Sequence, residues 1–114
     1  MTHPAQQVAI VLTTFSVGHA LAVARVLVDE RLAACVNILP PMTSVYRWQG
    51  DVSQEDEEQV VIKTTADRLA DLETRLRQLH PYELPEFLVI SADASSEAYL
   101  RWIGEAVHPP VEQV

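Results

Sequence analysis

The sequence of 114 residues has one cysteine, three glycines and no apolar run of the ~20 residues that a membrane-spanning helix needs. A single cysteine excludes an internal disulfide, which is typical of proteins in a reducing cytosol. The first seven residues, MTHPAQQ, carry neither the basic segment nor the apolar core of a secretion signal. We therefore expect a cytoplasmic protein that is not embedded in a membrane.

Basic residues are half as frequent as acidic ones. Eight Lys and Arg against 16 Asp and Glu give a formal charge of −8, and no Lys/Arg cluster offsets it. Such a chain repels phosphate backbones, so nucleic acid is not expected as a partner. Much of the acidity lies in DVSQEDEE (51–58), which lacks the glycine and the ligand spacing of an EF-hand calcium loop. We expect this segment to be a solvated acidic face or loop.

The local motifs of common enzymes and metal sites are also missing. The chain has no glycine-rich phosphate loop, no CxxC, HExxH or HxxxH pattern, and no GxSxG elbow. His80 and Glu83 could act as an acid and a base, but no nucleophile or cofactor motif accompanies them. The sequence therefore favours a binding protein without a required cofactor over an enzyme.

The remaining patterns predict a single α+β domain over residues 1–114, with its core at about 8–107. Short apolar or β-branched runs predict strands at residues 8–14, 34–39, 43–48, 59–64 and 87–90. Apolar residues at helical spacing predict three helices, capped by Ser16, by Thr65 and by Ser95 or Ser96. In the first helix the apolar stripe consists of Leu21, Ala24, Leu27 and Val28.

Two short segments interrupt the β pattern. Pro40-Pro41 lacks backbone donors, so the strand must bulge or lie at an edge there. Gln49-Gly50-Asp51 predicts a turn that joins two strands into a long hairpin, with Tyr46 and Trp48 near its tip.

This order of elements is typical of the ferredoxin-like split βαβ fold with an additional C-terminal helix. In that fold, an antiparallel sheet carries its helices on one face. Strands that are almost wholly apolar are typically buried on both faces, yet no predicted element remains to cover the second face of the sheet. The open face and the hairpin aromatics therefore predict a symmetric oligomer that buries them.

The segment LHPYELPEF (79–87) combines an imidazole, a helix-ending proline, a phenol and a carboxylate within four residues. His80 precedes a proline at the end of a predicted helix. It either binds the last carbonyl groups of that helix or serves as a metal ligand beside Glu83. A histidine before a helix-ending proline is ordinary, which favours the first alternative.

Cys35 and Lys63 each lie in an apolar strand. Cys35 is either a buried, inert thiol or a soft ligand for copper or mercury, which would need partners from elsewhere in the fold or from another subunit. Lys63 either extends its ammonium group to solvent, holds an anionic ligand or pairs with Glu83. Five aromatic residues are more typical of packing or interfaces than of a ligand pocket: Tyr46, Trp48, Tyr82, Tyr99 and Trp102.

The order and spacing of five segments resemble the CutA divalent-cation tolerance proteins: RLAACVNILP, TSVYRWQGDV, VVIKT, HPYELPE and YLRWI. The resemblance covers about residues 8–104. It implies a ferredoxin-like subunit in a tight homotrimer similar to that of the PII signalling proteins. It also implies a role in the response to metal ions, with weak binding of Cu(II) or another divalent cation and no enzymatic activity.

Carried over residue by residue, the resemblance places these polar and aromatic residues in clefts between subunits. It implies metal ligands at His80, Glu83 and Cys35, and a ligand cleft lined by Lys63, Tyr82, Tyr46 and Trp48. The further cysteines of some metal-binding members are absent from this chain, so a thiolate-rich site is not expected. The alternative is a PII-like sensor of a small, anionic ligand, or a trimeric scaffold without physiological metal binding.

Overall fold

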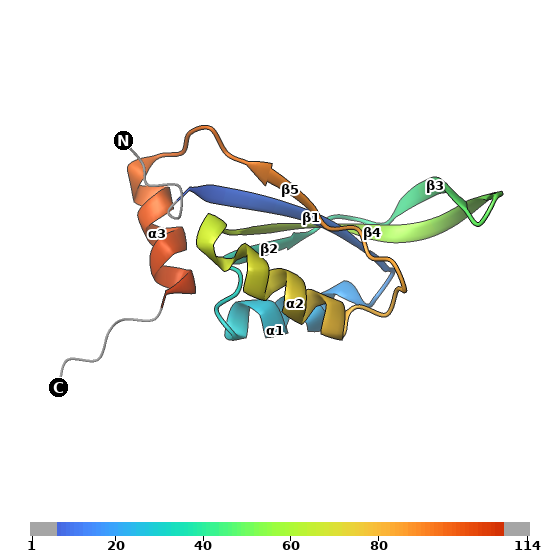
Figure 1. Cartoon of the computed structure of the whole chain (residues 1–114), viewed down its shortest axis with the longest axis horizontal. Helices are drawn as coiled ribbons and strands as arrows, with labels where there is room; N and C mark the ends of the chain where they lie inside the picture. Colours follow the sequence, from blue (N-terminus) through green and yellow to red (C-terminus); the bar gives the residue numbers. More distant parts are fainter. Residues whose placement is uncertain (1–6, 109–114) are drawn as a thin grey trace.

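The described part of the chain forms one five-stranded antiparallel sheet with three helices. The computed structural model describes residues 7–108. In chain order the elements are β1 (Val8–Ser16), α1 (Ala20–Asp29), β2 (Cys35–Ile38), β3 (Met42–Trp48), β4 (Asp51–Thr65), the 3-10 turn η2 (Ala66–Arg68), α2 (Leu69–Leu79), β5 (Leu88–Ser91) and α3 (Glu97–Val107). The strand order is β2-β4-β1-β5, and β3 also pairs with β4. Because α1 and α2 lie on one face of the sheet (Figure 1), the predicted ferredoxin-like fold is confirmed.

A bulge separates β2 from β3 at Pro40-Pro41. Ile38 lies opposite Val60 and Met42 lies opposite Glu57, so four steps along one chain match three steps along β4. The extra residue falls where two prolines have no N–H to donate to the ladder. The predicted interruption of the strand is therefore confirmed, and both segments still pair with β4.

The hairpin formed by β3 and β4 extends well beyond the helices (Figure 1). Gln49 and Gly50 form its two-residue turn with φ angles of 51° and 89°, the left-handed conformation that matches the twist of a hairpin. The acidic segment 51–58 is part of β4, so the prediction that the returning strand begins at Gln59 was wrong. Pairing with β3 satisfies the backbone of this segment even though few of its side chains are apolar.

The main core lies between the helices and one face of the sheet. It contains Val11 and Phe15 of β1, Val60 and Ile62 of β4, and Leu27, Leu72 and Leu76 of the helices. The predicted stripe of α1 was wrong in part, because Leu21 and Val28 are exposed while Ala20, Ala24 and Leu27 are buried. These three residues follow at steps of four and three, so they share the helix face that contacts the sheet.

The predicted helix caps have different outcomes. Ser16 still belongs to β1, and α1 begins at Ala20 without a side-chain cap. Thr65 does not cap its helix either; its hydroxyl group donates to the Asp67 carboxylate. Ser96 accepts a hydrogen bond from the Tyr99 N–H (3.2 Å), so this cap of α3 is confirmed.

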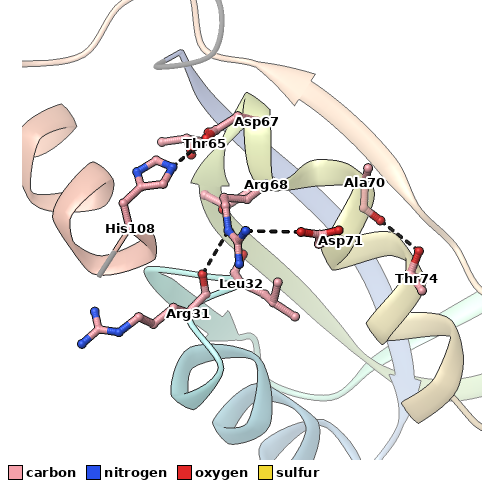
Figure 2. A network of polar contacts seen from close by, with 10 residues as sticks. Arg31, Leu32, Thr65, Asp67, Arg68, Ala70, Asp71, Thr74 and His108 are labelled. Atoms are coloured by element: carbon pink, nitrogen blue, oxygen red, sulfur yellow. Dashed lines mark hydrogen bonds and ion pairs between the residues drawn. The ribbon is translucent and has the colours of Figure 1, made fainter. Parts of the chain in front are cut away.

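Polar contacts join α3 to the rest of the subunit at the end of the sheet that is opposite the hairpin tip (Figure 1). Figure 2 shows His108 beside Asp67, with 2.6 Å between Nε2 and Oδ2. Burial alone would raise the pKa of Asp67, but hydrogen bonds from Thr65 and His108 outweigh it and lower this pKa. Arg68 donates to the Arg31 carbonyl oxygen (3.4 Å), which ties the turn after α1 to the start of α2.

No helix within residues 7–108 combines the length and the apolar character that crossing a bilayer requires.

Core packing predicts different costs for two leucine truncations on neighbouring helices. Leu72 is fully buried, so Leu72→Ala should lower the free energy of unfolding by ~2–5 kcal/mol. Leu21 is 57% exposed, so Leu21→Ala should cost less than ~1 kcal/mol. Urea denaturation at one fixed protein concentration measures both, and equal losses would contradict this assignment of the core.

Candidate functional site

The segment between α2 and β5 crosses one end of the sheet and carries the HPYE residues. Its first residue, His80, ends α2 with an extended backbone (ψ 131°). Its backbone N–H, and not its ring, donates to a helix carbonyl group, that of Leu76 (2.8 Å). The prediction that the His80 side chain binds the last carbonyl groups of its own helix was therefore wrong.

The His80 ring is buried against β1. It stacks on Phe15 with 4.1 Å between ring centroids, and the residue is only 7% exposed. Nε2 lies 2.8 Å from the Thr14 carbonyl oxygen, and Nδ1 accepts the Tyr82 N–H at 3.1 Å. A carbonyl oxygen can only accept, so Nε2 carries the proton of a neutral ring.

Burial lowers the pKa of His80, although the Thr14 carbonyl group and the charge of Glu57 act in the opposite direction. Both ring nitrogens already have hydrogen-bond partners. The ring would have to give up one of these hydrogen bonds before it could ligate a metal ion. In this conformation, His80 positions the segment that follows it.

Tyr82 connects that segment to two strands. Its hydroxyl group donates to Glu57 Oε2 at 2.7 Å and lies 3.1 Å from Ser16 Oγ, whose own proton completes the second hydrogen bond. Burial, assisted by the hydrogen bond to Glu57, raises the pKa of Tyr82 to about 12. Tyr82 is therefore a hydrogen-bond donor at neutral pH and not a base.

Glu57 is a residue of the candidate site that sequence reasoning missed. It is 7% exposed, and no other acidic side chain in the described part of the chain is buried. The sequence placed it in a solvated acidic segment because its immediate neighbours are acidic. The signal that could have found it is the two-residue period of β4, which puts Glu57 on the same face as Gln59, Val61 and Lys63.

A groove of about 890 Å³ opens between the hairpin and residues 82–86. Its lining includes four carboxylates and three aromatic side chains: Glu55, Glu57, Glu83, Glu86, Tyr46, Trp48 and Tyr82. Gln59 Nε2 donates to Glu86 Oε1 (3.2 Å) and fixes one side of the groove. No basic side chain is among the lining residues, so the electrostatics favour a cationic occupant over the anionic ligand of the alternative, sensor-type hypothesis.

The other two candidate residues lie elsewhere on the sheet. Cys35 and Lys63 are opposite each other in the β2–β4 register. Six residues of extended strand separate Lys63 from Glu57, which corresponds to ~20 Å. Cys35 is half-buried, and within residues 7–108 its thiol group forms one long hydrogen bond, to Asn37 Oδ1 (3.9 Å). Among residues 7–108, no three His, Cys, Asp or Glu side chains are placed to hold a metal ion together.

The sheet face that α1 and α2 leave open carries a cluster of apolar side chains beside polar ones. Register pairs place Ile10 beside Ile90, and Leu12 beside Leu88 and Val61. The prediction of β5 as a core strand was wrong for the single subunit, because all four of its residues are exposed; Ile90 is 48% exposed. An exposed edge strand made mostly of apolar residues is typical of a surface that packs against another molecule.

Comparisons with known proteins agree with the resemblance seen in the sequence. The family described as CutA1 divalent ion tolerance protein matches residues 8–106. The divalent-cation tolerance protein CutA of Thermus thermophilus is 42% identical over 96 residues, which cover 84% of this chain and 93% of that protein. This chain spans about half the length of the vertebrate CutA relatives that it also matches.

Two solved structures have the same fold. CutA from Xylella fastidiosa is 41% identical with a TM-score of 0.86, and the match covers 90% of this chain and 99% of that one. The PII-like protein CutA from Nostoc sp. is 39% identical with a TM-score of 0.83, covering 88% and 97%.

The buried neutral ring of His80 predicts a loss of stability in acid. The pKa of His80 in the folded state lies below the value of about 6.5 in an unfolded chain. At pH values between these two pKa values, the unfolded state therefore binds more protons than the folded state. The contribution of His80 is present above pH 6.5 and decreases as the pH falls below it. Unfolding free energies from pH 7.5 to 5 should fall more steeply in the wild type than in His80→Gln. His19→Gln, a variant at an exposed histidine, should retain the wild-type slope; an identical slope in all three proteins would contradict this role.

Proposed function

The chain belongs to the CutA1 divalent ion tolerance family, and we propose that it acts as a homotrimer in the response to divalent metal ions. The matched family is named for ion tolerance and not for a reaction. The proposal has two parts, self-association and weak cation binding. The observation that supports the first part is the open apolar face of the sheet.

Self-association is supported by β5 and the face beside it. Val89 and Ile90 are 45% and 48% exposed in the single subunit. Among the described strands β5 pairs only with β1, so its outer edge is available for hydrogen bonding to another chain. In an oligomer with closed rotational symmetry, each copy would bury this edge and face against its neighbour. The family resemblance implies three copies.

Weak cation binding is supported by the carboxylates of the groove. Glu83 is exposed, and no hydrogen bond or ion pair occupies it within residues 7–108. Carboxylate oxygens alone suit hard cations such as Mg²⁺, Ca²⁺ and Mn²⁺, whereas Zn(II) and Cu(II) favour nitrogen or sulfur ligands beside them. The absence of a complete ligand set within residues 7–108 of one subunit is therefore consistent with low affinity for Cu(II) or Zn(II). Of the three expected metal ligands, Glu83 and Cys35 keep available donor atoms, whereas His80 does not.

A PII-like ligand sensor is the second candidate function. The groove is large enough for a small molecule and offers three aromatic side chains for packing. Its carboxylates favour a positively charged ligand. A molecule that stays bound through native mass spectrometry of untreated protein, and that Tyr82→Ala releases, would favour this candidate.

The first part of the proposal predicts a trimer that depends on β5. Native mass spectrometry of the untagged chain should give three subunits per particle. Ile90→Glu places a charge in the proposed interface and should shift the protein to monomers, whereas Leu21→Glu on the exposed side of α1 should not. A wild-type monomer, or an Ile90→Glu trimer, would contradict the interface.

The second part predicts saturable metal uptake by that trimer. Added Cu(II) or Zn(II) should bind in a fixed number per particle, and Glu83→Gln should weaken uptake by about tenfold. Glu105→Gln removes an exposed carboxylate of α3 and controls for the general acidity of the surface. Uptake without a fixed stoichiometry, or equal uptake by both variants, would contradict a metal site at the groove.

A further inference from the structure

A small apolar cluster attaches α3 to the end of the sheet. Ile103 and Val107 are the buried residues of this 11-residue helix, and they pack on Val8 and Ala34. The cluster is separate from the main core between the sheet and the other two helices. An element with so little buried apolar surface can detach locally while the rest of the fold stays intact. The polar contacts at its C-terminal end therefore affect how firmly α3 is held.

Both ring nitrogens of His108 face hydrogen-bond acceptors at that end of α3. Nδ1 lies 2.9 Å from the Gly104 carbonyl oxygen, and Nε2 lies 2.6 Å from Asp67 Oδ2 (Figure 2). A carbonyl oxygen and a carboxylate can only accept, so each contact is a hydrogen bond only when its nitrogen carries a proton. A neutral imidazole has one such proton. The observed geometry is therefore fully satisfied only by the positively charged ring.

The surroundings of the ring favour this charged form. Burial alone would raise the pKa of Asp67, but hydrogen bonds from Thr65 and His108 outweigh it and lower this pKa, so Asp67 is a carboxylate at neutral pH. His108 also follows the last turn of α3, where the helix dipole places partial negative charge on the carbonyl groups. The carboxylate and the helix end act in the same direction.

The other charged side chains near His108 have partners or face solvent. Arg31, after α1, donates to the Ala106 carbonyl oxygen (3.1 Å), and Arg68 of η2 pairs with Asp71 (3.3 Å). Three charged residues of α3 line a shallow groove together with His108: Glu97, Arg101 and Glu105. Among residues 7–108, Asp67 is the charged side chain that forms a hydrogen bond with the ring.

We propose that His108 and Asp67 form a proton-dependent latch that fastens α3 to the turn after β4. The charged ring makes both hydrogen bonds and an ion pair. Loss of one proton removes the ion pair and one of the two hydrogen bonds, and the Arg31 contact and the apolar cluster then hold the helix. Histidine changes charge between pH 5 and 8, so α3 is attached more firmly on the acidic side of this range. Detachment on the alkaline side would expose Ile103, Val107 and Ala34.

Hydrogen exchange of the wild-type chain tests the latch without any substitution. The probe is the His108 backbone N–H, which binds the Gly104 carbonyl oxygen (3.0 Å). Its protection factor, corrected for intrinsic exchange, should be about threefold to fivefold higher at about pH 5.5 than at about pH 8.5. The effect is modest because the side chains of His108 and Asp67 are 45% and 36% exposed. Protection that does not change with pH would overturn the proposal.

Two substitutions assign the pH dependence to the pair. His108→Gln and Asp67→Asn should each remove the difference in protection between the two pH values. The double variant at about pH 5.5 should lose no more protection than either single variant, because the two residues act through one contact. Additive losses, or an unchanged pH dependence in Asp67→Asn, would contradict the latch.

Matched controls separate the latch from general effects of charge. Glu105→Gln removes an exposed carboxylate of the same helix and should retain the wild-type pH dependence. Arg31→Met removes the other polar contact of α3 and should lower protection by the same factor at both pH values. Loss of the pH dependence in Glu105→Gln would assign the effect to the overall charge of the helix and overturn the proposal.

Discussion

The alternation of side chains along β4 places Ile62 and Thr64 against the helices and Val61 and Lys63 on the opposite face. The same two faces continue across the sheet, because β1, β2 and β3 each pair with β4, and β5 pairs with β1. One face becomes a complete core within the subunit. The second face carries apolar side chains, the buried Glu57, and Lys63, which no ion pair among residues 7–108 engages.

The element order was predictable from the sequence because it depends on local chemistry. Helical spacing of leucines in α2, the two prolines after β2 and the turn at Gln49-Gly50 each have one simple structural consequence. The phase of α1 was less predictable, since Leu21 and Val28 are apolar but exposed. Composition alone does not distinguish a buried apolar residue of a helix from an exposed one.

The candidate site was predictable only in part for a similar reason. Tyr46, Trp48, Tyr82 and Glu83 line one groove. The family resemblance, and not their spacing in the sequence, implied a common cleft for them. The buried state of Glu57 depends on a residue 25 positions away, Tyr82, that reaches it from another element. The His80 ring likewise has its hydrogen-bond partners on β1 and in its own loop, so both nitrogens of this expected metal ligand are engaged within the subunit. Contacts between distant segments leave no periodic trace in the sequence.

The unbroken course of β4 also limits how this fold can change in evolution. Beyond Glu57 the hairpin consists of β3, β4 and a two-residue turn, so it can lengthen or shorten by one residue on each strand without disturbing the sheet. Between Glu57 and Lys63 a single inserted residue would turn one of them to the other face. Insertions and deletions should therefore accumulate at the outer end of the hairpin, while the spacing between these two charges stays fixed.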